Sequence, residues 1–344
     1  MRLVTIRPPT RDGSDPHSQR VAVMLPSGRY LPVGSLAMLM PDDLAEEIEG
    51  LPMSTVLALD PGLGVIRRAL QRADPKAVEE AAVDQADVIL APPIPRPGKI
   101  VGVGYNYLDH IREQGLERPD RPVLFSKFAN ALAGQGEPIR RPAGTHALDF
   151  EAELAIVIGR RASRVKVENG LRHVSGYTVA NDVTARDWQG QARALQPGEK
   201  GDGQWLRAKG SDTFLPLGPA LVPADELGDG RGLRIRSWRT AASGPQANQE
   251  IQMQDGTTDD LLFGVAELVS LISQEVTLDP GDVIITGTPS GVGVFRDPPV
   301  FLEPGDVVSV EVEPIGILTN PIVDENGRAP EGSPAARALE ARFA

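Results

Sequence analysis

The sequence Asp-Phe-Glu-Ala-Glu-Leu-Ala-Ile-Val-Ile, at residues 149–158, decides the fold class of this chain. Its second half, residues 154–158, is a short apolar run rich in β-branched residues, which is typical of a β-strand. Similar runs occur from residue 99 onward, at 100–103, 177–180, 283–286 and 307–312. Turns rich in glycine and proline separate them. The sequence therefore predicts a mainly β fold with some α-helix.

One helix is predicted inside this β-rich region, over residues 259–272. Leu262, Val265, Val269 and Ile272 would form one apolar stripe at helical spacing. The 36 glycines and 31 prolines among 344 residues favour short strands and turns over a helical bundle.

The domain organisation is predicted from changes in composition. Residues 1–95 are expected to form a small N-terminal accessory domain, 96–328 a catalytic domain and 329–344 a C-terminal tail. The proline-rich stretch 91–97 suits a linker, because it can continue neither a helix nor a central strand.

Smaller elements are predicted within these domains. Within the first domain, residues 21–25 predict a strand and Pro41-Asp42-Asp43 the start of a helix. The polar, glycine-containing segments 191–203 and 228–249 are expected to be mobile.

Charge and composition exclude several classes of protein. The net charge is -12 and no basic cluster occurs, so binding to nucleic acid is not expected. The chain has no cysteine, which excludes disulfides, thiolate metal sites and cysteine nucleophiles. No apolar stretch approaches the ~18 residues of a membrane span, and the first residues lack a signal peptide. A cytoplasmic location is therefore expected.

Glu151 and Glu153 are candidates for a metal site. Residues two apart on a strand point to the same side, so their carboxylates would lie about 6 to 7 Å apart along the backbone. Phe150, Ala152 and Leu154 would then point to the other side. For an isolated pair of this kind, a solvated strand face is the more common explanation.

Asp182 adds a third carboxylate, at the end of the apolar strand predicted at 177–180. Three carboxylates without histidine or cysteine suit Mg²⁺ or Mn²⁺ better than Zn²⁺. Asp149 and Asp187 are rival ligands that spacing alone does not exclude.

His110 is the histidine most suited to catalysis, because Glu113 follows one helical turn later and could orient its ring. A surface contact between the two is the alternative. The other three histidines, His17, His146 and His173, lie in polar stretches and are expected to be solvated.

A lysine and a glycine-rich turn complete the candidate site. A lysine beside a metal could stabilise a developing enolate oxygen, but from its surroundings in the sequence alone Lys209, which follows Arg207 closely, fits a surface lysine better. Lys127 would share a strand face with Phe125, and its role is open. The turn 287–293 offers backbone N–H groups to an anion but lacks the Gly-Lys of a nucleotide-binding loop.

The chain resembles the fumarylacetoacetate hydrolase superfamily over about residues 98–325. Six blocks carry the resemblance in consistent order, at 104–113, 122–130, 149–155, 181–189, 205–214 and 285–293. The resemblance implies a mixed β-sandwich roll, a homodimer, and Mg²⁺ or Mn²⁺ bound by Glu151, Glu153 and Asp182. It further implies a short lid helix carrying His110 and Glu113, with Lys209 in the active site. The implied substrate contacts are Tyr105, Lys127, Arg186, Gln189 and Thr288.

The chain departs from the family pattern before its main helix. Residues 248–254 lack an expected glycine, Gln254 stands one residue late, and residues 240–249 have the look of an insertion. This segment affects the substrate side of the site and hence specificity.

The leading functional hypothesis is hydrolytic cleavage of a C–C bond in a 2,4-dioxo-acid such as an acylpyruvate or fumarylpyruvate. The cation would hold the small oxo-acid, His110 with Glu113 would activate water, and Lys209 would stabilise the enolate. Decarboxylation of oxaloacetate, or isomerisation or dehydration of a 2-oxo-acid, is the alternative at the same site. A catalytically silent binding protein is the remaining alternative.

Overall fold

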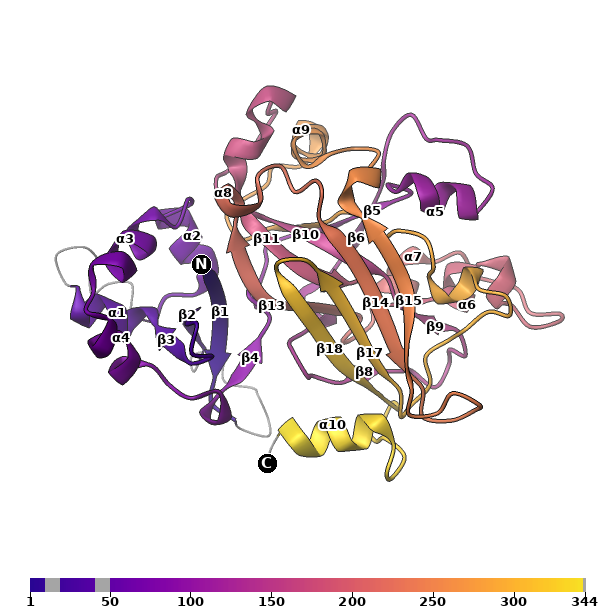
Figure 1. Ribbon diagram of the computed structural model, residues 1–344. Helices are drawn as coiled ribbons and strands as arrows, with labels where there is room; N and C mark the ends of the chain where they lie inside the picture. Colours follow the sequence, from indigo (N-terminus) through magenta and orange to yellow (C-terminus); the bar gives the residue numbers. More distant parts are fainter. Residues whose placement is uncertain (10–18, 41–49, 343–344) are drawn as a thin grey trace.

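A computed structural model describes residues 1–9, 19–40 and 50–342. The fold is mainly β, with helices around two packed sheets (Figure 1). The larger, 11-stranded sheet runs in the order β3-β2-β1-β13-β11-β10-β16-β5-β6, with β4 on β1 and β7 on β13. A 5-stranded sheet, β15-β14-β17-β18-β8, packs on it, and β9 pairs with β12. The predicted fold class is confirmed.

The strands of the larger sheet are β1 (Arg2–Arg7), β2 (Arg20–Met24), β3 (Tyr30–Pro32), β4 (Ile89–Ala91), β5 (Ile100–Gly104), β6 (Val123–Lys127), β7 (Leu132–Ala133), β10 (Ala152–Ile158), β11 (Val174–Asn181), β13 (Leu215–Pro223) and β16 (Val283–Ile285). The other strands are β8 (Ile139–Arg140), β9 (Leu148–Asp149), β12 (Thr184–Ala185), β14 (Arg234–Thr240), β15 (Glu250–Thr257), β17 (Val307–Val312) and β18 (Gly316–Val323).

The α-helices are α1 (Val33–Leu39), α2 (Met53–Leu59), α3 (Gly64–Arg72), α4 (Pro75–Ala81), α5 (Leu108–Glu113), α6 (Arg186–Gln189), α7 (Trp205–Lys209), α8 (Ala224–Leu227), α9 (Val265–Glu275) and α10 (Pro334–Arg342). The 3₁₀ helices are η3 (Gln85–Asp87), η4 (Ala129–Ala131), η5 (Val167–His173), η6 (Ala192–Ala194), η7 (Thr258–Asp260) and η8 (Gly293–Phe295). The helix predicted after residue 41 and the histidine at 17 lie outside the described residues.

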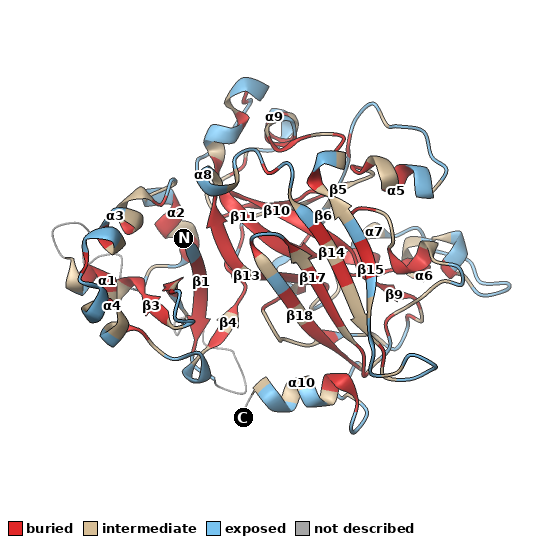
Figure 2. Ribbon diagram, in the orientation of Figure 1, coloured by how far each residue is buried: buried red, intermediate tan, exposed pale blue. Residues whose placement is uncertain are grey.

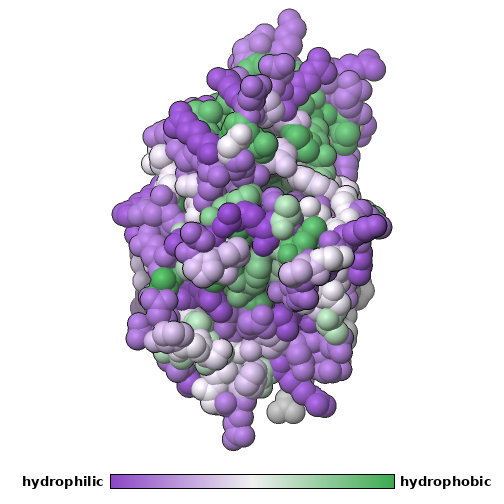
Figure 3. Space-filling view, turned by 90° about the vertical axis from the view of Figure 1, so that its right-hand side faces the viewer, coloured by the Kyte–Doolittle hydropathy of each residue, from purple (hydrophilic) through white to green (hydrophobic). Residues whose placement is uncertain are grey.

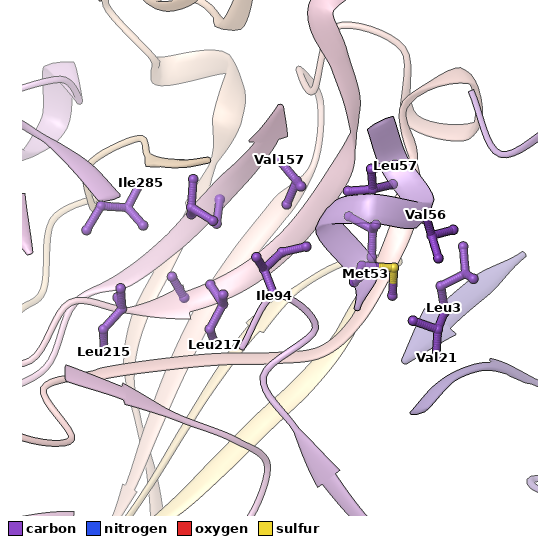
Figure 4. Packing of buried hydrophobic residues seen from close by; sticks show 14 of the residues in the cluster. Leu3, Val21, Met53, Val56, Leu57, Ile94, Val157, Leu215, Leu217 and Ile285 are labelled. Atoms are coloured by element: carbon purple, nitrogen blue, oxygen red, sulfur yellow. The ribbon is translucent and has the colours of Figure 1, made fainter. Parts of the chain in front are cut away.

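The N-terminal strands are joined to the main sheet. Leu3 of β1 pairs with Leu221 of β13, so the sheet continues across the proposed boundary at residue 95. One apolar cluster also spans it, from Leu3 and Met53 to Val157 and Ile285 (Figure 4). The division into two domains stays a prediction, and this shared core is the contact through which the two parts support each other.

Strand β10 lies in the middle of the larger sheet and is buried on both faces (Figure 2). Ala152 and Leu154 pack toward the 5-stranded sheet, whereas Ala155 and Val157 belong to the other apolar cluster. Phe150 belongs to the same cluster as Ala155 and Val157, so the prediction that it shares a face with Ala152 and Leu154 is wrong. The physical reason is that β10 begins only at residue 152, so strict alternation does not extend back to residue 150.

The predicted strands at 21–25, 100–103, 154–158, 177–180, 283–286 and 307–312 are confirmed, with ends that differ by at most three residues. The predicted helix at 259–272 is wrong in its start, because α9 begins at Val265. Asn106 holds the chain before the helix: its backbone carbonyl accepts from Leu262 N–H, and its Oδ1 accepts from Phe263 N–H at 2.8 Å. Glu267 then caps the helix by accepting from Gly264 N–H at 2.7 Å.

The expectation that residues 228–249 are mobile is wrong for residues 234–240, which form β14. This strand is paired on both sides, with β15 and with β17. The strand was not predicted because its side chains are largely polar. They form ion pairs, as Arg236 does with Glu311, while the backbone pairs with the neighbouring strands. The apparent insertion at 240–249 is the connection between β14 and β15, closed by Asn248 N–H donating to Ala241.

Candidate metal centre and active site

Three buried carboxylates meet at the start of β10 and the end of β11. Glu151 precedes β10, Glu153 lies on it, and Asp182 follows β11. Residue Ala152 pairs with Asn181 across the two strands, which places the three acids side by side. Their oxygen atoms lie within 4.8 Å of one another, and the exposed fractions are 6%, 1% and 0%. A solvated strand face is thus excluded for this pair of glutamates.

Two lysines and an arginine compensate part of this negative charge. Lys209 Nζ donates to Glu151 Oε2 at 2.9 Å, to Asp182 Oδ2 at 2.5 Å and to Thr184 Oγ1 at 2.9 Å. Lys127 Nζ donates to Asp182 Oδ1 at 2.5 Å. Arg186 donates to Glu151 Oε1 at 2.6 Å through one amino group. None of these cations reaches Glu153, whose carboxylate accepts from Gly287 N–H at 2.7 Å.

The pKa values of the acids follow from this arrangement. Burial, with the charges of Asp182 and Glu151, raises the pKa of Glu153 well above its ordinary value. Burial also acts to raise the pKa of Glu151, but Lys209 and Arg186 outweigh it and hold that pKa below its ordinary range. Burial acts to lower the pKa of Lys209, yet Asp182 and Glu151 raise it overall. Among the three acids, Glu153 is therefore the one that forms no direct ion pair with a described lysine or arginine.

These residues fit a divalent cation. The donor atoms are all carboxylate oxygens, the type that Mg²⁺ and Mn²⁺ prefer, and no histidine or cysteine belongs to the group. A cation bound here would supply the positive charge that Glu153 lacks. The identity of the metal stays a prediction.

Arg186 and the two rival acids take supporting positions. Asp149 accepts from Arg186 Nε at 2.8 Å and from the backbone N–H groups of Gly293 and Val294. Asp149 therefore orients Arg186, which in turn holds Glu151. Asp187 accepts from Thr145 Oγ1 at 2.6 Å, away from the three acids.

His146 is not simply solvated, as its position in a polar stretch suggested. Its Nδ1 lies 3.3 Å from Asp187 Oδ2, while its Nε2 lies 3.4 Å from Glu199 Oε2 and 3.0 Å from the Ala194 carbonyl. The two carboxylates thus face different nitrogens of one ring. Because one ion would need donors that converge, the ring is better described as a bridge between α6 and the 191–203 segment.

His110 and Glu113 lie on α5, which is only six residues long. His110 Nδ1 is 2.9 Å from Glu113 Oε2, and the His110 side chain is 9% exposed. The Phe295 ring packs edge-on against the imidazole with centroids 5.6 Å apart. A surface contact is thus excluded, and Nε2 of His110 is the nitrogen left for a ligand.

The 287–293 turn binds anions, but they are carboxylates of the chain itself. Besides Gly287 on Glu153, Ser290 N–H donates to Asp109 at 3.1 Å and Gly291 N–H to Glu113 at 3.0 Å. The expectation that these backbone groups are free for a substrate anion is therefore wrong. The turn instead connects Glu153 of the acidic group with the helix that carries His110.

Most of the predicted residues line one cavity of about 180 Å³. The predicted residues among its walls are Tyr105, His110, Glu151, Glu153, Asp182, Arg186, Gln189, Lys209 and Thr288. Lys127 and Glu113 are not among them: each contacts a residue of the wall, Asp182 and His110 respectively. The substrate contacts stay predictions.

Several residues of the site were not predicted. Trp205, Phe125 and Phe295 add aromatic walls, and Gln114 and Gln191 add amides. Gln254 receives the Ala152 N–H at 3.0 Å and donates to Thr288 at 2.7 Å. Its late position in the sequence is absorbed by a β-bulge, since Ser237 pairs with Gln254 but Trp238 with Gln252. No local pattern signals Phe295, which reaches the cavity only through the fold.

Comparison with known proteins identifies relatives of this chain. A family model for the C-terminal domain of fumarylacetoacetate (FAA) hydrolase matches residues 99–323. The cattle protein named oxaloacetate tautomerase FAHD2A, mitochondrial, is 44% identical over 276 residues, covering 79% of this chain and 81% of that protein. The human protein of the same name is 41% identical over the same shares. No helix within the described residues is long and apolar enough to cross a membrane. A cytoplasmic location stays a prediction, since these relatives are named as mitochondrial.

Solved structures share the fold over nearly the whole chain. The fumarylacetoacetate hydrolase of Exiguobacterium antarcticum has 30% identity and a TM-score of 0.71, covering 94% of this chain and 99% of that one. The 5-carboxymethyl-2-hydroxymuconate delta-isomerase of Mycobacterium smegmatis has 32% identity, the same coverage and a TM-score of 0.65. Through this sequence match and the shared fold, the chain belongs to the fumarylacetoacetate hydrolase family.

Proposed function

We propose that this protein is an enzyme that interconverts the enol and keto forms of a small 2-oxo-acid, with oxaloacetate as the first substrate to test. The observation that carries the proposal is one cavity lined by His110, by the three acids and by Lys209. A base close to a strongly polar, enolate-stabilising centre is what proton transfer beside a carbonyl requires. The names of the cattle and human relatives support the choice of reaction and substrate.

Each residue has a role that its contacts support. Glu151, Glu153 and Asp182 would hold Mg²⁺ or Mn²⁺, and a cation bound there supplies positive charge that favours the enolate form of a 2-oxo-acid. Glu113 holds the imidazole of His110 by Nδ1, which leaves Nε2 to move a proton to or from C3 of the substrate. Lys209 donates to Glu151 and Asp182 and so holds both carboxylates in place.

A second candidate is hydrolytic cleavage of the C–C bond in a 2,4-dioxo-acid, the leading hypothesis from the sequence. The same pair, with His110 at the cavity and Glu113 behind it, would suit the activation of water, and a hydrolase is among the structural neighbours. Decarboxylation of oxaloacetate would use the same enolate. A silent binding protein would be expected to lack the acids or His110, and the chain has both.

The experiment that separates these reactions is product analysis in D₂O. The Mg²⁺- or Mn²⁺-loaded protein is mixed with oxaloacetate, and separately with an acylpyruvate, and products are identified by NMR and mass. Tautomerisation accelerates deuterium entry at C3 and the decay of the enol signal without changing the carbon skeleton. Release of CO₂ with pyruvate would assign decarboxylation instead, and two acids from the acylpyruvate would assign hydrolysis. If the protein accelerates neither tautomerisation, decarboxylation nor hydrolysis, the proposal that it is an enzyme of this kind is refuted.

We also propose that the protein forms a homodimer through the free edge of β6, the last strand of the larger sheet. Leu124 on this strand is 41% exposed, Phe128 beside it 51%, and Leu206 of α7 56%. Apolar side chains gather among hydrophilic ones on the face that carries α5, α6 and α7 (Figure 3). Exposed apolar edges of this kind favour pairing with a second copy.

Light scattering after gel filtration tests the dimer. Leu124→Lys should give a monomer by placing a charge at the interface, whereas Val276→Lys, at an exposed residue after α9, should leave the dimer intact. If the wild type is a monomer at micromolar concentration, or if Leu124→Lys is still a dimer, the proposed interface is refuted.

A further inference from the structure

We infer that the cavity accepts a second class of substrate: 2-oxo-acids that carry an uncharged planar group at C3, with phenylpyruvate as the simplest member. The planar group would pack against Trp205. This inference rests on the proposed tautomerase function, because it concerns the outer half of the same cavity.

An aromatic wall leads outward from the acidic centre. Lys209 Nζ lies 4.9 Å from the centroid of the Phe125 ring. The Phe125 ring packs edge-on against Trp205 with centroids 5.5 Å apart, and Trp205 packs edge-on against Tyr105 at 6.4 Å. These three residues are half-buried and all line the cavity, so part of each ring is open to it.

A fourth aromatic ring lines the same cavity. It belongs to Phe295, which packs edge-on against His110. A flat group attached to C3 of an oxo-acid would therefore lie among aromatic rings, while His110 stays close to C3. Rings pack well in offset and edge-on arrangements and remove a large apolar area from water.

The outer half offers no free counter-charge for a second carboxylate. Among the described residues that line the cavity, the lysine and arginine are Lys209 and Arg186. The three protons of Lys209 meet three acceptors, and Arg186 is held by Asp149, Glu151 and Gln189. Other polar side chains that line the cavity are uncharged, among them the amides of Gln114 and Gln191. An uncharged group is thus better matched to this region than a carboxylate that must lose its water.

The size of the cavity limits the group to one ring. Its volume of about 180 Å³ is below the roughly 300–1,000 Å³ typical of sites for drug-sized ligands. The reaction needs no further reactant. The enol loses the proton of its C2 hydroxyl, the C2=O bond forms, and the electrons of the C2=C3 bond take up a proton at C3.

The test compares phenylpyruvate with oxaloacetate in the metal-loaded protein. We expect kcat/KM for enol-phenylpyruvate to be at least one tenth of that for enol-oxaloacetate. Trp205→Leu should lower the ratio of the two values at least tenfold. Trp238→Leu is the matched control, because Trp238 lies on β14 beside Arg236 and does not line the cavity.

A binding measurement separates the failure of this inference from failure of the proposed function. Calorimetry with phenylpyruvate and the Mg²⁺-loaded protein should give a Kd that Trp205→Leu weakens at least tenfold and Trp238→Leu leaves unchanged. Turnover of oxaloacetate with phenylpyruvate below one tenth would overturn the inference and leave the function standing. Turnover of neither, with Trp205-dependent binding, would refute the function but keep the aromatic subsite. Binding that ignores Trp205 would overturn the subsite.

Discussion

At the scale of single residues, Glu153 differs most from its neighbours. Lys209 contacts Glu151 and Asp182, and Lys127 contacts Asp182, whereas among the described residues Glu153 has a backbone N–H and no ion pair as its partner. A glutamate whose pKa is raised on folding destabilises the protein as the pH rises above its ordinary value of 4.5. The charge of Glu153 therefore destabilises the metal-free protein and stabilises the protein once a cation binds.

Glu153→Gln should for this reason melt at the same or a higher temperature than the wild type when both are metal-free at pH 7. The variant should lose the stabilisation by Mg²⁺ or Mn²⁺, which for the wild type is about 2.7 kcal/mol when the metal stands at 100 times its Kd. Thermal melts with metal and with EDTA measure both effects, and Glu168→Gln on the exposed surface is the control. An unchanged response of the variant to metal would contradict the assignment of Glu153 as a ligand.

His110→Asn should lower kcat by about 10²- to 10⁴-fold, the usual contribution of general acid–base catalysis. Because the three acids are untouched, metal-dependent stabilisation should persist. The half-buried His173, whose ring contacts the Arg160 carbonyl and does not line the cavity, provides the control variant His173→Asn. Enol decay rates and thermal melts with metal give the two readouts, and a fully active His110→Asn would exclude the ring from proton transfer.

At the scale of elements, Asn106 shows how loops position the site. It follows β5, and its side chain is buried. Its Nδ2 donates to the Thr286 carbonyl at 2.8 Å and to Phe263 O at 3.2 Å, while Oδ1 accepts from Phe263 N–H. One amide thus ties together the start of the α5 segment, the end of β16 and the entry to α9.

Asn106→Ala should lower the free energy of unfolding by about 1–3 kcal/mol, the cost of leaving buried polar groups without partners. Activity should fall as well, because α5 carries His110. Urea unfolding measures the first effect, with Asn326→Ala at an exposed turn as the control. Equal stability of the two variants would show that the three bonds do not hold these elements.

At the scale of the whole molecule, Glu137 joins three distant parts of the chain. It pairs with Arg7 of β1 at 2.7 Å and with Arg342 of α10 at 3.1 Å, and accepts from Gly134 N–H. Burial acts to raise the pKa of Glu137, but the Gly134 bond and the two arginines outweigh it and lower the pKa below 4.5. The N-terminal strands, the central region and the C-terminal helix therefore meet at one carboxylate.

Glu137→Gln should destabilise the protein by about 1–3 kcal/mol at pH 7. Because the folded pKa is lowered, the contribution of Glu137 is complete above pH 4.5 and fades as the pH falls through the folded pKa. Urea unfolding across this range should thus show the two proteins converge in acid. The exposed Glu331, changed to Gln, serves as control. A difference that stays constant with pH would exclude the charge as its source.

The sequence by itself determined the fold class, several of the strands and the three candidate acids. Strand runs such as 154–158 and 307–312 are local apolar patterns, and local patterns can be read without tertiary contacts. The start of α9 could not be read in this way, because Asn106, far away in the chain, captures the backbone before it. β14 was missed because its side chains are largely polar and its pairing with β17 joins residues far apart in the sequence.

The spacing of the acids within residues 149–158 indicated a metal site, but only the tertiary structure decided what surrounds these acids. It separated Asp149, which orients Arg186, from Glu151 and Glu153, which lie beside Asp182. It also turned the N–H groups of the 287–293 turn onto the chain's own carboxylates and brought Phe295 to the cavity. The reason is physical: charge compensation, burial and cavity walls arise between residues far apart in sequence, whereas spacing describes only neighbours.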